Sequence, residues 1–211
     1  MKKFFLLILA MMLTAAVCSA GAEGSLVDSV YNSLNPDTGI HLNYTMLVPS
    51  MNIEINYDVH AKGISHYLTK TSQAYGTTIV DVSCFIGDTS YILKPDTMEA
   101  QVVMTLSPTL LKYYNFLGQD ELGKLLKKWA GSSGYSIETR EVNGIPYTVE
   151  VYPAGEDGTE NAFYFDYLSR LTYIRDDSLA IIGERFITVN TIDTEVNESL
   201  LDISAYTVIE K

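Results

Sequence analysis

The side chains of this 211-residue sequence that could support chemistry are few and widely spaced. Its three histidines, His41, His60 and His66, form no His-x-x-x-His pair, the spacing that presents two metal ligands on one helix face. No closely spaced cysteines could add metal ligands to them. We therefore expect each histidine to be solvated or hydrogen-bonded, and we expect neither a metal nor another cofactor.

Two acidic segments, residues 156–160 and Asp176-Asp177, carry oxygen ligands of the kind that calcium prefers. Neither has the Asp-x-Asp-x-Asp-Gly spacing of a calcium-binding loop, so both are predicted to be solvated loops. The sequence also contains no Gly-x-Ser-x-Gly motif, no glycine-rich phosphate loop and no Cys/His catalytic motif. We therefore expect a protein that is not an enzyme.

The N-terminal segment has the pattern of an export signal. Two lysines precede an apolar run over residues 4–13, and small residues follow up to Ala20. This pattern predicts a signal peptide over residues 1–20 and a single exported domain over residues 21–211. Two alternatives remain open: a lipoprotein signal that makes Cys18 the lipidated residue, and an uncleaved anchor. The exported protein would be extracellular or associated with the cell envelope.

Cleavage of the signal leaves Cys84 as the single cysteine, so the mature chain could form no intramolecular disulfide. Cys84 falls on the apolar side of a strand pattern, and we expect a buried, inert thiol. No later segment approaches the length of an apolar membrane span, so we expect no transmembrane segment in the mature chain.

The charge balance argues against one class of partner. The chain has 14 Lys and Arg against 26 Asp and Glu, for a net charge of −12, and cleavage of the signal removes two of the lysines. Such an acidic surface repels phosphate backbones, so we expect no nucleic-acid partner. Hydrophobic residues make up 47% of the chain, which is enough to form a sizeable core.

Most of the sequence has the period-two pattern of strands. Residues 51–59 alternate apolar and polar side chains, and similar segments joined by short turns predict about six antiparallel strands with one apolar face over residues 40–106. After residue 134, Asn143-Gly144 is a strong hairpin signal, and more alternating segments follow up to Val189.

Two segments have helical spacing instead. Ser25 and Asp28 form a capping-box-like start to a helix that Asn35-Pro36 ends. Residues 107–130 predict two further helices, the second with Trp129 on its apolar face. Together these elements predict an α+β fold: a large curved antiparallel sheet of about ten strands, a half-barrel, with helices covering its concave face.

The element order and three local motifs resemble the LolA/LppX-like family of lipoprotein carriers and related exported proteins. The motifs are the hairpin ending in Pro95-Asp96-Thr97, the hairpin with Asn143-Gly144 three residues before Tyr147, and residues 196–206, which contain Val-Asn-Glu-Ser-Leu-Leu-Asp-Ile. The closing motif has Leu201 where the family usually has Phe, and Ser204 where it usually has Pro. The resemblance implies the half-barrel fold and a ligand cavity on its concave side.

Two functions fit this interpretation. In the first, the concave sheet binds a hydrophobic ligand, such as a lipid or a lipoprotein acyl chain, beneath the helices of residues 107–130, and Trp129 packs under them. In the second, the core is filled and the protein is a cell-envelope module for protein–protein interaction or sensing. The residues predicted to line the ligand cavity, or else to fill the core, are Met46, Ile53, Ile55, Tyr57, Val82, Met98, Val102, Met104, Phe163 and Phe165.

Overall fold

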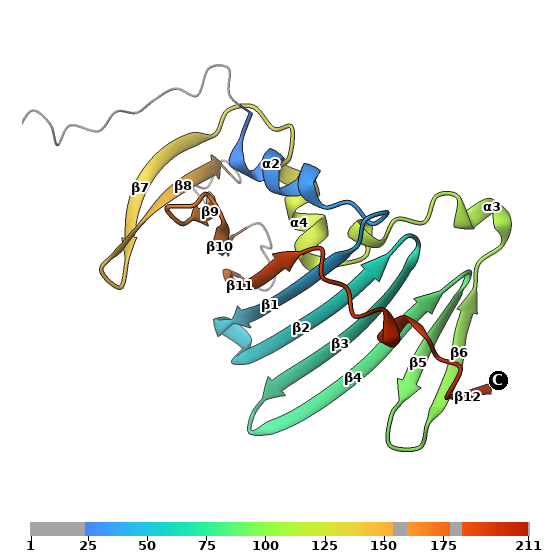
Figure 1. Ribbon diagram of the computed structural model, residues 1–211. Coiled ribbons are helices and arrows are strands. Elements are labelled where there is room, and N and C mark those ends of the chain that lie inside the picture. Colours follow the sequence, from blue (N-terminus) through green and yellow to red (C-terminus); the bar gives the residue numbers. More distant parts are fainter. Residues whose placement is uncertain (1–23, 154–159, 178–182, 211) are drawn as a thin grey trace, which may run out of the picture.

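A computed structural model describes residues 24–153, 160–177 and 183–210 of the chain (Figure 1). Twelve strands form the sheet: β1 (Ile40–Val48), β2 (Ile53–Lys62), β3 (Ser65–Ala74), β4 (Thr77–Ile86), β5 (Thr89–Lys94), β6 (Glu99–Thr105), β7 (Ser136–Val142), β8 (Ile145–Pro153), β9 (Glu160–Phe165), β10 (Leu171–Asp176), β11 (Arg185–Asp193) and β12 (Thr207–Ile209). The helices are α2 (Leu26–Ser33), α3 (Pro108–Leu111) and α4 (Glu121–Trp129), with short 3-10 turns η1 (Pro49–Met51), η2 (Phe116–Gly118) and η3 (Glu198–Leu201).

All twelve strands belong to one open sheet, in the order β12-β6-β5-β4-β3-β2-β1-β11-β10-β9-β8-β7. Every paired neighbour is antiparallel except β12, which runs parallel to β6. The predicted α+β half-barrel is confirmed, with twelve strands in place of about ten. The extra edge strand β12 is possible because residues 194–206 cross from β11 to the far edge of the sheet, and a parallel pairing requires such a long connection.

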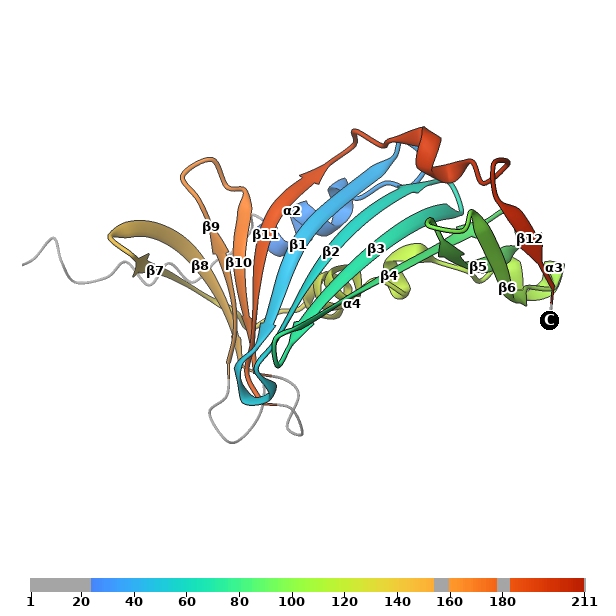
Figure 2. The ribbon, with the colours of Figure 1, turned by 90° about the horizontal axis from the view of Figure 1, so that it is seen from below.

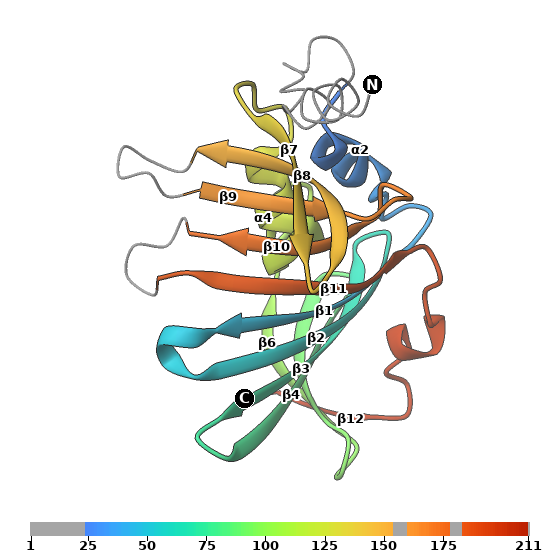
Figure 3. The same cartoon turned by 90° about the vertical axis from the view of Figure 1, so that its left-hand side faces the viewer.

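The sheet is bent into an arch whose two sides are covered differently. Figure 2 shows α2 and α4 inside the arch and the C-terminal segment, residues 194–206, along its outside. Figure 3 shows α2 and α4 beside β7 to β10, at the end of the sheet away from β4. The helices therefore cover one half of the concave face, as the sequence predicts, and leave the half formed by β3 to β6 without them.

The local signals in the sequence explain several element boundaries. The side chain of Ser25 accepts a hydrogen bond from the Asp28 N–H and caps α2 as predicted. Asn143 and Gly144 both adopt positive φ, +53° and +80°, as the two-residue turn between β7 and β8 requires. Each end of these elements is thus fixed by a residue suited to its backbone conformation.

Two buried carboxylates connect the helices to the sheet. Glu150 on β8 accepts hydrogen bonds from the backbone N–H groups of Leu26 and Val27, at 2.5 and 3.3 Å, and from the Tyr152 hydroxyl. Asp120, which caps α4, accepts from the Gly123 N–H and from the Tyr44 hydroxyl of β1. Burial raises the pKa of Asp120, although both hydrogen bonds act to lower it. Each helix start is thereby held at a defined place on the concave face.

Within the described residues, the helices are all too short to cross a membrane.

We predict that Glu150→Gln destabilises the fold. The amide replaces one acceptor oxygen with an NH2 group that faces a hydrogen-bond donor, so one buried donor loses its partner. We expect the free energy of unfolding, measured in urea, to fall by about 1–3 kcal/mol. Glu141→Gln, on the exposed surface of the β7–β8 hairpin, is the matched control and should have no measurable effect. Equal stabilities of the two variants would contradict this role of Glu150.

We also predict that Gly123→Ala is destabilising, although alanine is the better helix former by about 1 kcal/mol. A Cβ at position 123 would lie 2.6 Å from the Leu117 carbonyl oxygen, a backbone atom that cannot rotate away. We expect a loss of about 1–3 kcal/mol in unfolding free energy. Gly118→Ala is the control, since the nearest atom to its added Cβ is 4.0 Å away. A Gly123→Ala protein that is more stable than the wild type would show that η2 and α4 are packed less closely.

Candidate functional site

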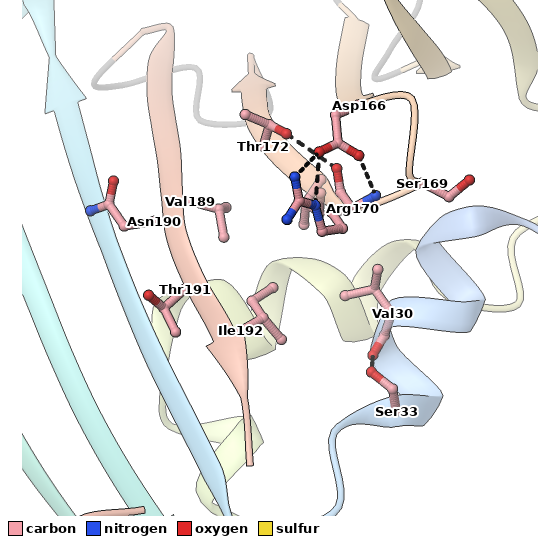
Figure 4. A pocket seen from close by; sticks show the side chains of 11 residues that line it. Val30, Ser33, Asp166, Ser169, Arg170, Thr172, Val189, Asn190, Thr191 and Ile192 are labelled. Atoms are coloured by element: carbon pink, nitrogen blue, oxygen red, sulfur yellow. Dashed lines mark hydrogen bonds and ion pairs between the residues drawn. The ribbon is translucent and has the colours of Figure 1, made fainter. Parts of the chain in front are cut away.

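A groove runs along one side of α2, where this helix faces the end of β11 and the β9–β10 turn. The pocket beside the β9–β10 turn, called the turn pocket below, has a volume of about 530 Å³. In Figure 4, Val30 from α2 and Val189 and Ile192 from β11 point into the same space, and Asp166 and Arg170 close its upper side. The pocket therefore combines a few apolar side chains with polar ones and a charged pair, which suits a ligand with one apolar and one polar part.

Two further pockets lie beside it. The turn pocket shares Ser33 and Ile192 with a pocket of about 260 Å³, which in turn shares Leu34 with a pocket of about 600 Å³ beside η2. We refer to the three together as the α2 groove. Its buried apolar lining consists of Leu34, Ile40, Phe116, Leu117, Leu171 and Val189. The three pockets thus lie one after another beside α2 and the segment that follows it, separated by the side chains that they share.

The charged rim of the groove is a local structure of the β9–β10 turn. The Asp166 carboxylate accepts hydrogen bonds from the Leu168 and Arg170 N–H groups and pairs with the Arg170 guanidinium. Burial raises the pKa of Asp166, but the hydrogen bonds from Arg170 and Leu168 outweigh it and leave this pKa below the usual range. Asp166 is therefore ionised at neutral pH and holds Arg170 at the groove, with most of the Arg170 side chain exposed.

Six of the residues predicted to line a cavity lie together on the concave face beneath the helices. Met46, Tyr57, Phe163 and Phe165 are buried, the two phenylalanines completely, and Ile53 and Ile55 are half-buried. All of them except Ile53 pack into one cluster with α2, η2 and α4. Under the helices, this half of the concave face is consequently filled by side chains.

The prediction of one apolar face over residues 40–106 is wrong. The register pairs Tyr57 with Lys70 and Lys70 with Asp81, so polar side chains follow the apolar concave side of β2 at this level of the sheet. Further along β4, Phe85 is still buried on the concave side, where Tyr114 stacks on it. Val82 and Val102 point to the opposite, convex side, where Val82 packs with Cys84 and Leu93. Ile203 and Tyr206 of the C-terminal segment cover this second cluster. At the level of Tyr57, the buried side of the sheet therefore changes between β2 and β4.

The two remaining methionines of the prediction are exposed. Met98 lies in the β5–β6 turn with φ +53°, and Met104 on β6 is on the concave side, in the half that α2 and α4 leave uncovered. Among the described residues, none of the ten predicted lining positions borders the α2 groove. Strand alternation marks the middle of strands, whereas the groove lies at strand ends and beside a helix. The Asp166–Arg170 pair next to an apolar strand was the one signal for it in the sequence.

Other predictions about reactive side chains can be compared with the structure. Cys84 is buried as predicted, and burial raises the pKa of its thiol to about 11. All three histidines have hydrogen-bond partners: His41 with Asp58, His60 with the Asn197 N–H, and His66 with the Tyr114 hydroxyl.

The predicted signal peptide, Cys18 and most of the acidic segment 156–160 lie outside the described residues.

Comparisons with known proteins give likenesses of structure only. No family model matches the chain, and no curated protein matches it. Among solved structures, LprF from Mycobacterium bovis is similar with a TM-score of 0.44 and 12% identity, over 83% of this chain and 97% of that one. An uncharacterized conserved protein from Thermus thermophilus gives a TM-score of 0.46 and 9% identity, over 88% and 97% of the two chains.

A third solved structure carries a family name. The LolA superfamily protein NE2245 from Nitrosomonas europaea is similar with a TM-score of 0.35 and 13% identity, over 86% of this chain and 98% of that one. All three likenesses are remote, with TM-scores below 0.5 and identities of 9–13%.

Proposed function

We propose that the protein is an exported, non-enzymatic binding protein for an amphiphile with an apolar chain, such as a lipid or a lipoprotein acyl chain. The observation that carries this proposal is the α2 groove, whose three pockets each contain buried apolar side chains and lie in a row between the Asp166–Arg170 pair and η2. Its turn pocket of about 530 Å³ lies within the usual range of small-molecule sites. The export pattern of residues 1–20 supports a place of action in the cell envelope or outside the cell.

Affinity in this site would come from the burial of the apolar chain, worth about 0.8 kcal/mol per methylene. The exposed guanidinium of Arg170 and the hydroxyl groups of Ser33 and Thr191 would meet the polar end of the ligand or surrounding water. The ligand would thus lie beside the filled core, in contact with α2, rather than beneath the helices.

We predict that Ser33→Trp weakens binding, because position 33 lies where two pockets of the groove meet and an indole would block them. Displacement of about two methylenes corresponds to roughly tenfold weaker binding. The measurement is titration with a fluorescent fatty acid, together with native mass spectrometry of the protein purified from its own host. The matched control is Asn32→Trp, an exposed neighbour on α2 that lines none of the three described pockets. No uptake by the wild type, or equal effects of both variants, would overturn the groove proposal.

A second candidate function rests on the uncovered half of the concave face. Ile79, Ile92 and Met104 share this face and are each about half exposed, at 55%, 46% and 50%. Ile92 and Met104 lie near each other on β5 and β6, whereas Ile79 lies further along β4, beyond Asp81. Neighbouring exposed apolar side chains such as Ile92 and Met104 are typical of a surface that another protein covers. This arrangement supports a cell-envelope interaction module with a filled core.

The two candidates differ in their response to Ile92→Glu. If the uncovered concave half binds a protein, the wild type should cross-link to a partner in envelope extracts and the Ile92→Glu variant should not. The reason is that the variant would have to bury an unpaired carboxylate in the interface. Thr78→Glu, on the exposed convex side of β4, is the control. Uptake of fatty acid should be unchanged in both variants, since neither residue borders the α2 groove. A partner retained equally by both variants would exclude this surface.

A further inference from the structure

Four side chains of metal-ligand type meet on the convex face of the sheet, where three neighbouring strands run side by side. In the register, His41 of β1 lies opposite His60 of β2 on one side and opposite Asp193 of β11 on the other. Asp58 precedes His60 by two residues and therefore points to the same face. The sequence separates these residues widely, but the pairing of β11, β1 and β2 brings them together.

The distances within this cluster are close to those of a metal site. The Asp58 carboxylate lies 3.0 Å from Nε2 of His41 and 3.7 Å from Nε2 of His60. One ligand atom from each of the three residues fits within a span of 4.8 Å. Tetrahedral zinc with bonds of about 2.1 Å needs its ligand atoms about 3.4 Å apart, so small side-chain rotations suffice.

Asp193 occupies the position that supports a metal-bound histidine. Its carboxylate lies 3.5 Å from Nδ1 of His41, the ring nitrogen opposite the Asp58 side. A carboxylate there keeps the ring proton on Nδ1 and leaves the lone pair of Nε2 available to a metal, an arrangement usual at histidine ligands. The His41 ring also stacks on that of His60, with centroids 4.3 Å apart and an angle of 9° between the rings. To bind one ion through both Nε2 atoms, the two rings must tilt out of this stack, because a metal lies in the plane of the imidazole that binds it.

We propose that His41, Asp58 and His60 form a binding site for a divalent cation of the zinc type, with Asp193 as a positioning residue for His41. The nitrogen and carboxylate donors, and a coordination position left for water, match the preferences of zinc. The three proposed ligands, His41, Asp58 and His60, do not border the α2 groove, whereas the positioning residue Asp193 also lines its pocket of about 260 Å³. Zinc binding by the three ligands does not require the proposed amphiphile binding.

The site also involves the C-terminal segment. Nδ1 of His60 accepts a hydrogen bond of 3.3 Å from the Asn197 N–H. A metal on Nε2 of His60 places the ring proton on Nδ1, and this hydrogen bond is then lost. Cation binding would therefore remove the hydrogen bond between Asn197 and His60, and in its place a metal ion would join β1 and β2 through their side chains.

The test is a zinc titration of the chelator-treated full-length protein by calorimetry, with Co²⁺ absorption as a spectroscopic readout of the ligands. We expect one zinc per chain. His41→Gln and Asp58→Asn should each abolish this binding, and Asp193→Asn should weaken it about 10- to 100-fold. Asp96→Asn, in the exposed β5–β6 turn, is the control for weak binding to surface acids and should bind as the wild type does.

A second measurement needs no variant. In the wild type, one equivalent of zinc should shift the NMR resonances of the His41 and His60 rings and of the Asn197 amide, and leave those of His66 in place. The absence of a one-to-one site, binding that survives both His41→Gln and Asp58→Asn, or shifts confined to other residues would each overturn the proposal. In those cases His41 serves only as an ion-pair partner between Asp58 and Asp193.

Discussion

The arrangement of this protein depends on hydrogen bonds between buried carboxylates and helix N-termini. The first N–H groups of a helix have no partners within the helix, and a buried anion needs donors, so each satisfies the other. Glu150, in the middle of β8, accepts a hydrogen bond from the first N–H group of α2. Asp120 accepts one from the first turn of α4 and another from the Tyr44 hydroxyl on β1. An apolar contact could slide along the sheet, but these directional bonds fix where each helix starts.

The position of α2 has a direct consequence for the candidate binding site. Val27 of α2 is completely buried in the core, and Val30, one turn later on nearly the same face, packs at the edge of that core and lines the α2 groove with Ser33. The ion pair of Glu121 with Arg185 adds a connection between the start of α4 and β11. The groove therefore lies at the edge of the core that α2 covers, so a filled core and a ligand site are compatible.

Local sequence signals predicted those parts of the fold that depend on local chemistry. The Ser25 cap and the Asn143-Gly144 turn need only their own backbone conformations, and both were confirmed. The buried side of each strand was harder to predict. Val82 alternates with polar neighbours just as Tyr57 does, yet the two face opposite sides of the sheet. Alternation shows that a strand has an apolar side. Which side of the sheet buries it depends on segments that are distant in the sequence: α4 covers Tyr57, and residues 194–206 cover Val82.

The same distinction explains why the histidine cluster had no sequence signal. Metal motifs that can be recognised in a sequence place their ligands on one helix or loop, at a spacing set by that element. His41, Asp58 and Asp193 are instead neighbours across three strands, and β11, which follows β7 to β10 in the sequence, is the strand that pairs with β1. Their proximity is thus a property of strand order. The C-terminal segment depends on the same strand order, because it leaves β11 beside Asp193, passes His60 and ends on β6. A cation bound there would act on the one segment that spans both halves of the convex face.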